Sequence, residues 1–182
     1  MTILNEKDSI LIVIDVQEKL LNAVFNKNVL EKKAIIMAKA ATMLSIPAIV
    51  TEQYPVGLGN TVSSVLLSLP AGTSYFEKNT FSAIEVPEIV EILRTSRKHQ
   101  VVLFGIETHI CVSQTVNALV EAGYDVTVIS DACGSRTESE HVAGIERIKE
   151  NGGHVITTEM ALFEWLKSSK HPAFKEIQQM IK

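Results

Sequence analysis

The order of apolar and amphipathic segments predicts an α/β fold of three αβα layers, with an open parallel six-stranded sheet between helices. Short runs rich in β-branched residues alternate with longer stretches that carry apolar residues at helical spacing. Several of the short runs are apolar at every position, which is typical of strands covered by helices on both faces. The length of 182 residues suits a single domain over residues 1–182, and no linker or internal repeat divides it.

The first half of the chain supplies three of the expected strands. Asn26-Lys27-Asn28 is expected to break a long helical stretch into two helices. Pro47 stands near the start of a strand, where its missing N–H does little harm. The expected elements are, in order, a strand over 10–14, a helical stretch over 16–44, a strand over 46–51, a loop over 52–60, a short helix over 62–69 and a short strand over 73–76 that ends in Glu77-Lys78.

The second half supplies the other three strands. Pro87 fits the first turn of a helix, and Gly123 fits the end of one. Thr108 and Thr158 are the expected N-caps of the helices that follow them. The expected elements are a helix over 87–98, a strand over 100–104, a helix over 108–122, a strand over 125–130, a helix over 139–151, a strand over 154–157, a helix over 158–166 and a tail helix after Pro172.

The composition excludes several classes of function. The net charge is 17 − 21 = −4 and no stretch is basic, so neither nucleic acid nor an anionic membrane is an expected partner. The apolar run 10–14 is far shorter than the about 20 residues of a membrane helix. The first eight residues lack the pattern of a signal peptide. Cys111 and Cys133 form no disulfide framework and no CxxC pair, so we expect a cytoplasmic protein.

In a parallel sheet, ligands bind beyond the carboxyl ends of the strands, and Cys111 lies just after one of them. It is expected about three residues into a helix that starts directly after an apolar strand. Backbone N–H groups and the helix dipole favour a thiolate there and lower its pKa, and the same N–H groups can hold an oxyanion. The alternative is a small buried hydrophobic residue. Cys133, in a Gly/Ser-rich loop, is assigned that structural role.

Asp15 and Lys78 follow two other strands at the same edge of the sheet. Asp15 is a candidate general base, and its alternative role is to cap the next helix. Lys78 can stabilise a thiolate and orient a substrate, whereas its alternative is a solvated lysine paired with Glu77. The three residues together are more informative than any one, because the topology brings them to one edge. We expect their polar atoms to lie within about 3–5 Å of each other.

Other catalytic motifs are missing. The chain has no GxSxG elbow and no phosphate-binding GxxxxGK[ST] loop. Residues 57–62 match only the start of GxGxxG and follow the wrong strand for a dinucleotide site. No two of the five histidines have the spacing of a metal-binding helix, and His109 is expected to cap or line the pocket.

Four segments resemble the isochorismatase-like hydrolases, also called cysteine hydrolases. The matches run from about Ser9 to about Thr158. The subgroup of isochorismatase domain-containing proteins is the most similar, through Thr51-Glu52-Gln53-Tyr54-Pro55 and the Gly-Ile-Glu-Thr-His form of the cysteine segment. The four segments are Asp15-Val16-Gln17, Lys78-Asn79-Thr80-Phe81-Ser82-Ala83, Gly105-Ile106-Glu107-Thr108-His109-Ile110-Cys111-Val112 and Asp131-Ala132-Cys133-Gly134-Ser135-Arg136.

The resemblance implies the Rossmann-like hydrolase fold of that family and a catalytic triad of Asp15, Lys78 and Cys111. It also implies a cis peptide between Ile106 and Glu107, which directs the N–H groups of Glu107 and Cys111 at an oxyanion. The residues expected to contact a substrate are Gln17, Tyr54, Phe81 and Thr108. Family members are commonly oligomers, so a homo-oligomer is expected.

Two departures from the family narrow the function. Nicotinamidases carry an Asp-x-His…His metal site after the second strand, whereas residues 52–58 here contain no histidine, so neither a metal nor another cofactor is expected. True isochorismatases cleave an enol ether without a cysteine nucleophile, so Cys111 favours acyl transfer. The expected activity is hydrolysis of a small amide or related C–N bond through a thioester. The alternatives are a catalytically weak binding or scaffold protein and a redox-sensing cysteine protein.

Overall fold

Six parallel strands form one central sheet, in the order β3-β2-β1-β4-β5-β6. This result, from a computed structural model that describes residues 3–182, confirms the predicted α/β class and the parallel six-stranded sheet. Met1 and Thr2, at the start of the segment judged to lack a signal peptide, lie outside the described residues. The strands are β1 (Ser9–Ile14), β2 (Ala48–Gln53), β3 (Ser74–Lys78), β4 (Gln100–Gly105), β5 (Asp125–Ile129) and β6 (His154–Ile156).

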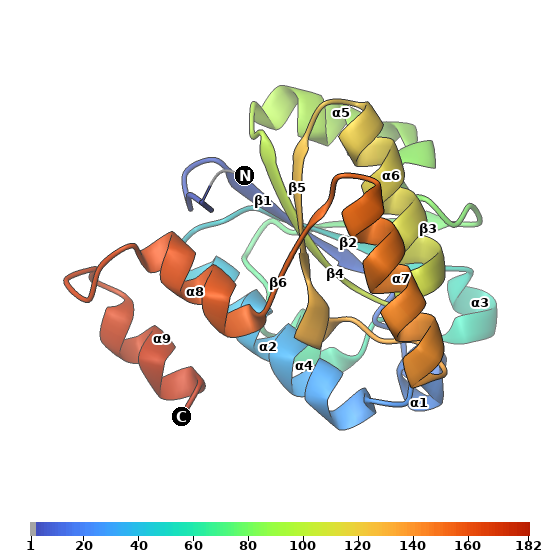
Figure 1. Ribbon diagram of the computed structural model, residues 1–182, viewed down its shortest axis with the longest axis horizontal. Helices are drawn as coiled ribbons and strands as arrows, with labels where there is room; N and C mark the ends of the chain where they lie inside the picture. Colours follow the sequence, from blue (N-terminus) through green and yellow to red (C-terminus); the bar gives the residue numbers. More distant parts are fainter. Residues whose placement is uncertain (1–2) are drawn as a thin grey trace.

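Helices cover both faces of the sheet (Figure 1). α2 and α8 pack together on one face, while α6 and α7 pack together on the other. No helix of the described part is long and apolar enough to cross a membrane. The helices are α1 (Glu18–Ala23), α2 (Lys27–Met43), α3 (Pro55–Leu58), α4 (Ser63–Leu66), α5 (Pro87–Ser96), α6 (Ser113–Glu121), α7 (Glu138–Glu150), α8 (Thr158–Leu166) and α9 (Phe174–Met180), with short turns η1 (Ala83–Glu85), η2 (Thr108–Val112) and η3 (Ser130–Ala132).

The strand order reverses between β1 and β4, and this switch point positions the site. Every residue of these two strands is buried, as the apolar runs 10–14 and 101–104 predict. Ile14, the last residue of β1, lies beside Thr51 of β2 and Gly105 of β4. The segments that follow β1 and β4 therefore leave the sheet side by side, where open α/β sheets bind ligands.

The structure corrects both predicted N-caps. The helix after β4 begins as a π-helical turn, η2, whose N-cap position is Glu107 instead of Thr108. The hydroxyl of Thr108 is engaged elsewhere, 2.9 Å from Nδ1 of His141. Thr157 caps α8 by accepting a hydrogen bond from the N–H of Met160, because the Thr158 hydroxyl donates to Asp131 instead.

Candidate active site

Asp15 lies directly beyond β1, fully buried, with both carboxylate oxygens engaged. Oδ1 accepts a hydrogen bond from the Thr51 hydroxyl at 2.6 Å, and Oδ2 lies 2.7 Å from Nζ of Lys78. The backbone of Asp15 has a positive φ of 50°, which is uncommon for a residue other than glycine. These contacts exclude the alternative role of a helix cap. Sequence analysis missed Thr51, because only the strand register places it beside Ile14 and next to Asp15.

Lys78 is the last residue of β3, and its side chain is completely buried. Besides Asp15, the ammonium lies within hydrogen-bond distance of three oxygens: Gln53 Oε1 at 2.8 Å, and the carbonyls of Thr80 and Phe81, both at 3.2 Å. Three N–H protons therefore face four acceptors. The alternative of a solvated lysine paired with Glu77 is wrong, and the ammonium is a fixed, fully hydrogen-bonded cation.

Cys111 lies in the π-helical turn, 6% exposed, and its thiol faces Asp15. The pKa of this thiol is raised to about 12, mainly by burial and also by the Asp15 carboxylate, which acts both by charge and as a hydrogen-bond acceptor. Lys78 and the Glu107 N–H act in the opposite direction but do not prevail. Lys78 and the turn therefore lower this pKa as predicted, but the predicted net direction is wrong for the resting site, because burial and Asp15 outweigh them. In the resting site, the neutral Cys111 thiol lies beside the Asp15–Lys78 ion pair.

The turn that carries Cys111 has an unusual backbone. The peptide bond between Ile106 and Glu107 is cis, at the position that the resemblance implied. Only glycine fits at position 105, where φ is +144° and a Cβ atom would lie 1.9 Å from the carbonyl oxygen of Ile14. The close packing of β1 against β4 therefore depends on this glycine.

The segment from Gly134 to Arg136 holds this turn in place. Gly134 accepts a hydrogen bond from Thr108 N–H at 2.9 Å and donates one to the Gly105 carbonyl at 3.3 Å. Nε of Arg136 lies 3.0 Å from the carboxylate of Glu107. The later family-like segment thus supports the nucleophile segment, a role that the sequence analysis did not assign to it.

Gln17 does not lie open to a substrate, contrary to the prediction. Its side chain is fully buried and its amide is satisfied by backbone groups: the oxygen accepts from Gln53 N–H at 2.7 Å, and the nitrogen donates to the carbonyls of Gln53 and Gly59. Gln17 therefore fixes Gln53, whose own side chain contacts Lys78. Gln53 is a second residue that sequence reasoning missed. It was expected in the loop over 52–60, whereas it is the last residue of β2 and lies beside Lys78 of β3.

The other three predicted contact residues divide into two kinds. Thr108 is buried and bonded to His141, so the structure corrects its assignment as a substrate contact. Tyr54 and Phe81 each expose about half of their surface, and their backbones flank Lys78. Tyr54 N–H donates to the Lys78 carbonyl at 3.0 Å, and the Phe81 carbonyl accepts from Lys78 Nζ. Because their backbones adjoin Lys78 and their side chains are half-exposed, both residues remain candidates for the rim of the site.

Residues expected to border the site have structural partners. Nδ1 of His109 lies 2.9 Å from the Ser135 hydroxyl. Glu52 accepts a hydrogen bond from Thr61 N–H at 2.6 Å. Across residues 3–182, no group of three or more His, Cys, Asp or Glu side chains is arranged to hold a metal ion.

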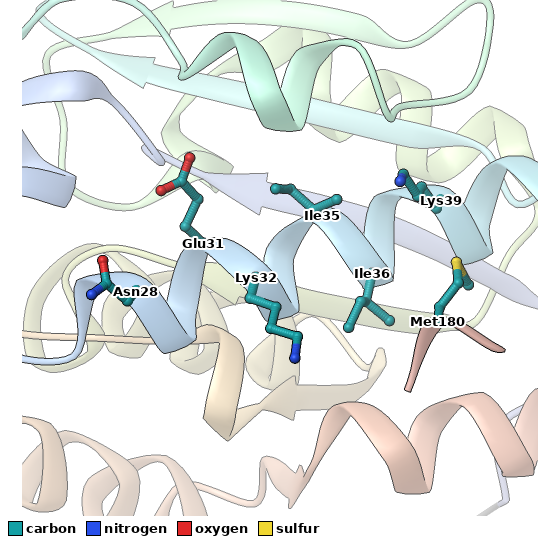
Figure 2. Close-up of a pocket in the computed structure, with 7 residues that line it drawn as sticks. All are labelled: Asn28, Glu31, Lys32, Ile35, Ile36, Lys39 and Met180. Atoms are coloured by element: carbon teal, nitrogen blue, oxygen red, sulfur yellow. The ribbon is translucent and has the colours of Figure 1, made fainter. Parts of the chain in front are cut away.

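A large surface groove lies elsewhere. Its volume is about 390 Å³, and Figure 2 shows its lining on α2, with Met180 beside Ile36. Its charged side chains, such as Lys32 and Lys39, are exposed to solvent. Because the buried, mutually bonded reactive groups are at the strand ends, we place the candidate active site there and not in the groove. The groove is lined by Asn28, Glu31, Lys32, Ile35, Ile36, Lys39 and Met180.

Comparison with known proteins identifies the family of the chain. The model of the isochorismatase domain matches residues 9–160, a span that includes β1 to β6 and the three candidate catalytic residues. The chain belongs to the isochorismatase family. As in the sequence-based assignment, isochorismatase domain-containing proteins are among its relatives.

Three similar proteins show what this isochorismatase-family chain resembles in sequence or in fold. Isochorismatase domain-containing protein 2 of Xenopus laevis is 36% identical over 179 residues, covering 98% of this chain and 85% of the relative. A structure described as MAR1 ribonuclease from Caenorhabditis elegans has a TM-score of 0.95 and 36% identity, covering 99% of this chain and 92% of the other. YcaC from Escherichia coli, described as an octameric hydrolase of unknown specificity, shares the fold (TM-score 0.89, 20% identity, 100% and 97% covered).

Proposed function

We propose that this isochorismatase-family protein is a cysteine-dependent hydrolase of small amides or related C–N bonds. The single observation that supports this most is the buried trio, in which the Cys111 thiol faces a carboxylate that is already paired with the Lys78 ammonium at 2.7 Å. A nucleophile next to a base, with the base oriented by a third group, is the common arrangement for covalent catalysis.

The first half of the proposed reaction forms a thioester. Asp15 takes the thiol proton as Cys111 Sγ attacks the substrate carbonyl carbon, and the carbonyl electron pair moves to its oxygen. The N–H groups of Glu107 and Cys111 hold this oxyanion. When the oxyanion collapses, the C–N bond breaks and the leaving nitrogen takes the proton from Asp15. Lys78 keeps its protons throughout and stabilises the negative charge that passes from Asp15 to sulfur.

The second half hydrolyses the thioester. Asp15 takes a proton from a water molecule, whose oxygen attacks the acyl carbon. The C–S bond then breaks, the acid leaves, and the sulfur recovers the proton from Asp15. A thiol with a pKa of about 12 suits this scheme, because proton transfer coupled to attack avoids a free thiolate in a buried site.

The redox-sensing alternative is weaker than the hydrolase. Sensor cysteines are accessible and have a low pKa, because the thiolate reacts with peroxide. Burial raises the pKa of both Cys111 and Cys133 to about 12. A scaffold role is compatible with the fold, but it gives no reason for burying an ion pair beside a thiol.

RNA cleavage deserves comparison because the Caenorhabditis elegans relative is described as a ribonuclease. RNA-binding sites usually offer free cations to phosphates. Here the cation of the trio is buried and fully hydrogen-bonded, and the net charge of the chain is −4. These observations favour the amide hydrolase. Assembly into a homo-oligomer, location in the cytoplasm and independence of cofactors stay predictions.

The proposal is tested by turnover of a panel of small amides, ureas and hydroxamates. We expect wild type to hydrolyse at least one class and to release amine or ammonia, whereas Cys111→Ala and Asp15→Asn lose this activity. Mass spectrometry of quenched reactions should find the acyl group on Cys111. Hydrolysis that persists in Cys111→Ala, or cleavage of a fluorogenic RNA without turnover of any amide, would overturn the proposal.

A further inference from the structure

We infer that the candidate site accepts an uncharged acyl group and disfavours substrates that carry a carboxylate or phosphate next to the scissile bond. This inference names the substrate class of the proposed hydrolase and therefore rests on that function. It follows from four features of the described residues: the engaged state of Lys78, the pairing of cations around the turn 107–111, the net charge of the buried trio and the nature of the rim.

Lys78 is not available to an anionic substrate. Its three protons already face Asp15 Oδ2, Gln53 Oε1 and the carbonyls of Thr80 and Phe81, at 2.7–3.2 Å. Its side chain has no exposed surface. A substrate carboxylate could bind this ammonium only by displacing one of these partners, which would leave a buried acceptor without a donor.

The cationic groups next to the nucleophile turn are also paired. Arg136 donates through Nε to the Glu107 carboxylate at 3.0 Å, and its Nη2 lies 4.0 Å from Glu140. His109 lies between the Ser135 hydroxyl, at 2.9 Å, and Glu140, at 3.7 Å. Arg136 therefore faces two carboxylates of the protein and offers little net positive charge to a ligand, and the His109 imidazole is held by Ser135 and Glu140.

The buried trio itself is neutral. Asp15 contributes one negative charge, Lys78 one positive charge, and the protonated thiol none. During attack a negative charge moves from the carboxylate to the sulfur and then to the oxyanion, and Lys78 balances it at each stage. A substrate carboxylate would add a second, unbalanced negative charge to a desolvated site, where an unpaired ion costs several kcal/mol. An amide group adds no charge.

The aromatic residues Tyr54 and Phe81, next to Lys78, also favour an uncharged substrate. Tyr54 and Phe81 present half-exposed rings on backbone that contacts Lys78. Aromatic walls bind planar, weakly hydrated groups such as amides and arenes better than strongly hydrated carboxylates.

The test uses two reagents of nearly equal size with the same leaving group, iodoacetamide and iodoacetate, which differ in charge. The rate at which each modifies Cys111 is measured at pH 8.5 by mass spectrometry of peptides, in the folded chain and in the chain unfolded by denaturant. The unfolded chain gives the intrinsic preference between the reagents. We expect the folded protein to prefer iodoacetamide at least tenfold more strongly than the unfolded chain does.

Two variants of the rim act as a matched pair. Phe81→Arg adds a cation next to the site and should increase labelling by iodoacetate several-fold, whereas Phe81→Gln, which adds no charge, should not. Arg136→Met should not weaken the preference for iodoacetamide, because that cation is already paired and its loss leaves the Glu107 carboxylate unneutralised.

The outcomes separate this inference from the proposed function. If the folded chain prefers iodoacetamide no more strongly than the unfolded chain does, the inference is overturned. The proposed role of Cys111 as the nucleophile is then unaffected. A strong preference for iodoacetamide, combined with no turnover of any amide, would support the charge selectivity of the site. It would contradict only the proposed hydrolase function.

Discussion

Two regions of this molecule contain the same pair of residue types. Asp15 and Cys111 meet beyond β1 and β4, while Asp131 and Cys133 follow β5 at the same edge of the sheet. Both cysteines are buried, and burial raises the pKa of each to about 12, with a nearby aspartate adding to the increase. Burial and a neighbouring carboxylate therefore do not distinguish a candidate nucleophile from a structural thiol.

The difference lies in what each aspartate binds. Asp131 accepts hydrogen bonds from the N–H and hydroxyl of Thr158, at 2.7 and 2.8 Å, and pairs with the partly exposed Lys33 at 3.3 Å. Its carboxylate thereby holds the start of α8. Asp15 has a fully buried lysine instead, and a thiol that is slightly exposed. A buried cation beside the thiol thus distinguishes the candidate active site from the Asp131–Cys133 pair, whose aspartate holds the start of α8.

The largest expected effect separates the two cysteines directly. Cys111→Ala should lower kcat by about 10³-fold or more on any amide that wild type hydrolyses, because the covalent step is lost. Cys133→Ala should leave kcat unchanged and lower the free energy of unfolding by about 1 kcal/mol, as a small buried truncation does. Steady-state kinetics and urea titrations measure both. A large fall in kcat for Cys133→Ala would erase the distinction between the regions.

A smaller effect is expected when a partner of the active-site ion pair is changed, such as Gln53, which accepts a hydrogen bond from Lys78. Gln53→Met removes one acceptor from Lys78, so the ammonium can shift away from Asp15. We expect kcat to fall about tenfold with KM little changed, the size of one hydrogen bond to a charged group. Lys33→Met, the matched change beside Asp131, should leave kcat at the wild-type value. A rise in KM without a change in kcat would show instead that Gln53 contacts the substrate.

The smallest effect concerns alkaline pH and should be shared by both regions. The pKa of each thiol rises from 9.0 in the unfolded chain to about 12 in the folded chain, so between these values the folded chain binds more protons. The stabilisation is present below pH 9 and is lost as the pH rises toward 12. Each cysteine should contribute a slope of about 1.4 kcal/mol per pH unit in this window.

Urea titrations from pH 8 to 10.5 measure this slope for wild type and for each cysteine-to-alanine variant. Both variants should reduce the slope of the free energy of unfolding against pH by a similar amount, although only Cys111→Ala affects turnover. If Cys111→Ala leaves the slope unchanged, the resting thiol at that position is not held in its protonated form.

The sequence by itself determined the fold class and the edge at which the site lies. Uniformly apolar runs such as 10–14 can be buried only in a sheet covered on both faces, and the carboxyl ends of parallel strands share one edge. Asp15, Lys78 and Cys111 could therefore be grouped before any coordinates were known. The sequence also predicted that Lys78 lies beside Cys111 and that Cys133 has no basic partner, and the groups that act on the two thiols agree with this.

Tertiary structure alone decided the contacts and the charge state of the site. Gln17 and Thr108 looked like substrate contacts, but their polar atoms are bonded to Gln53 and His141, which are distant in the chain. Thr51 and Gln53 became visible as partners of Asp15 and Lys78 only through strand register. The pKa of Cys111 was predicted in the wrong direction, because a helix terminus can be read locally, whereas desolvation is the sum of everything packed around the sulfur.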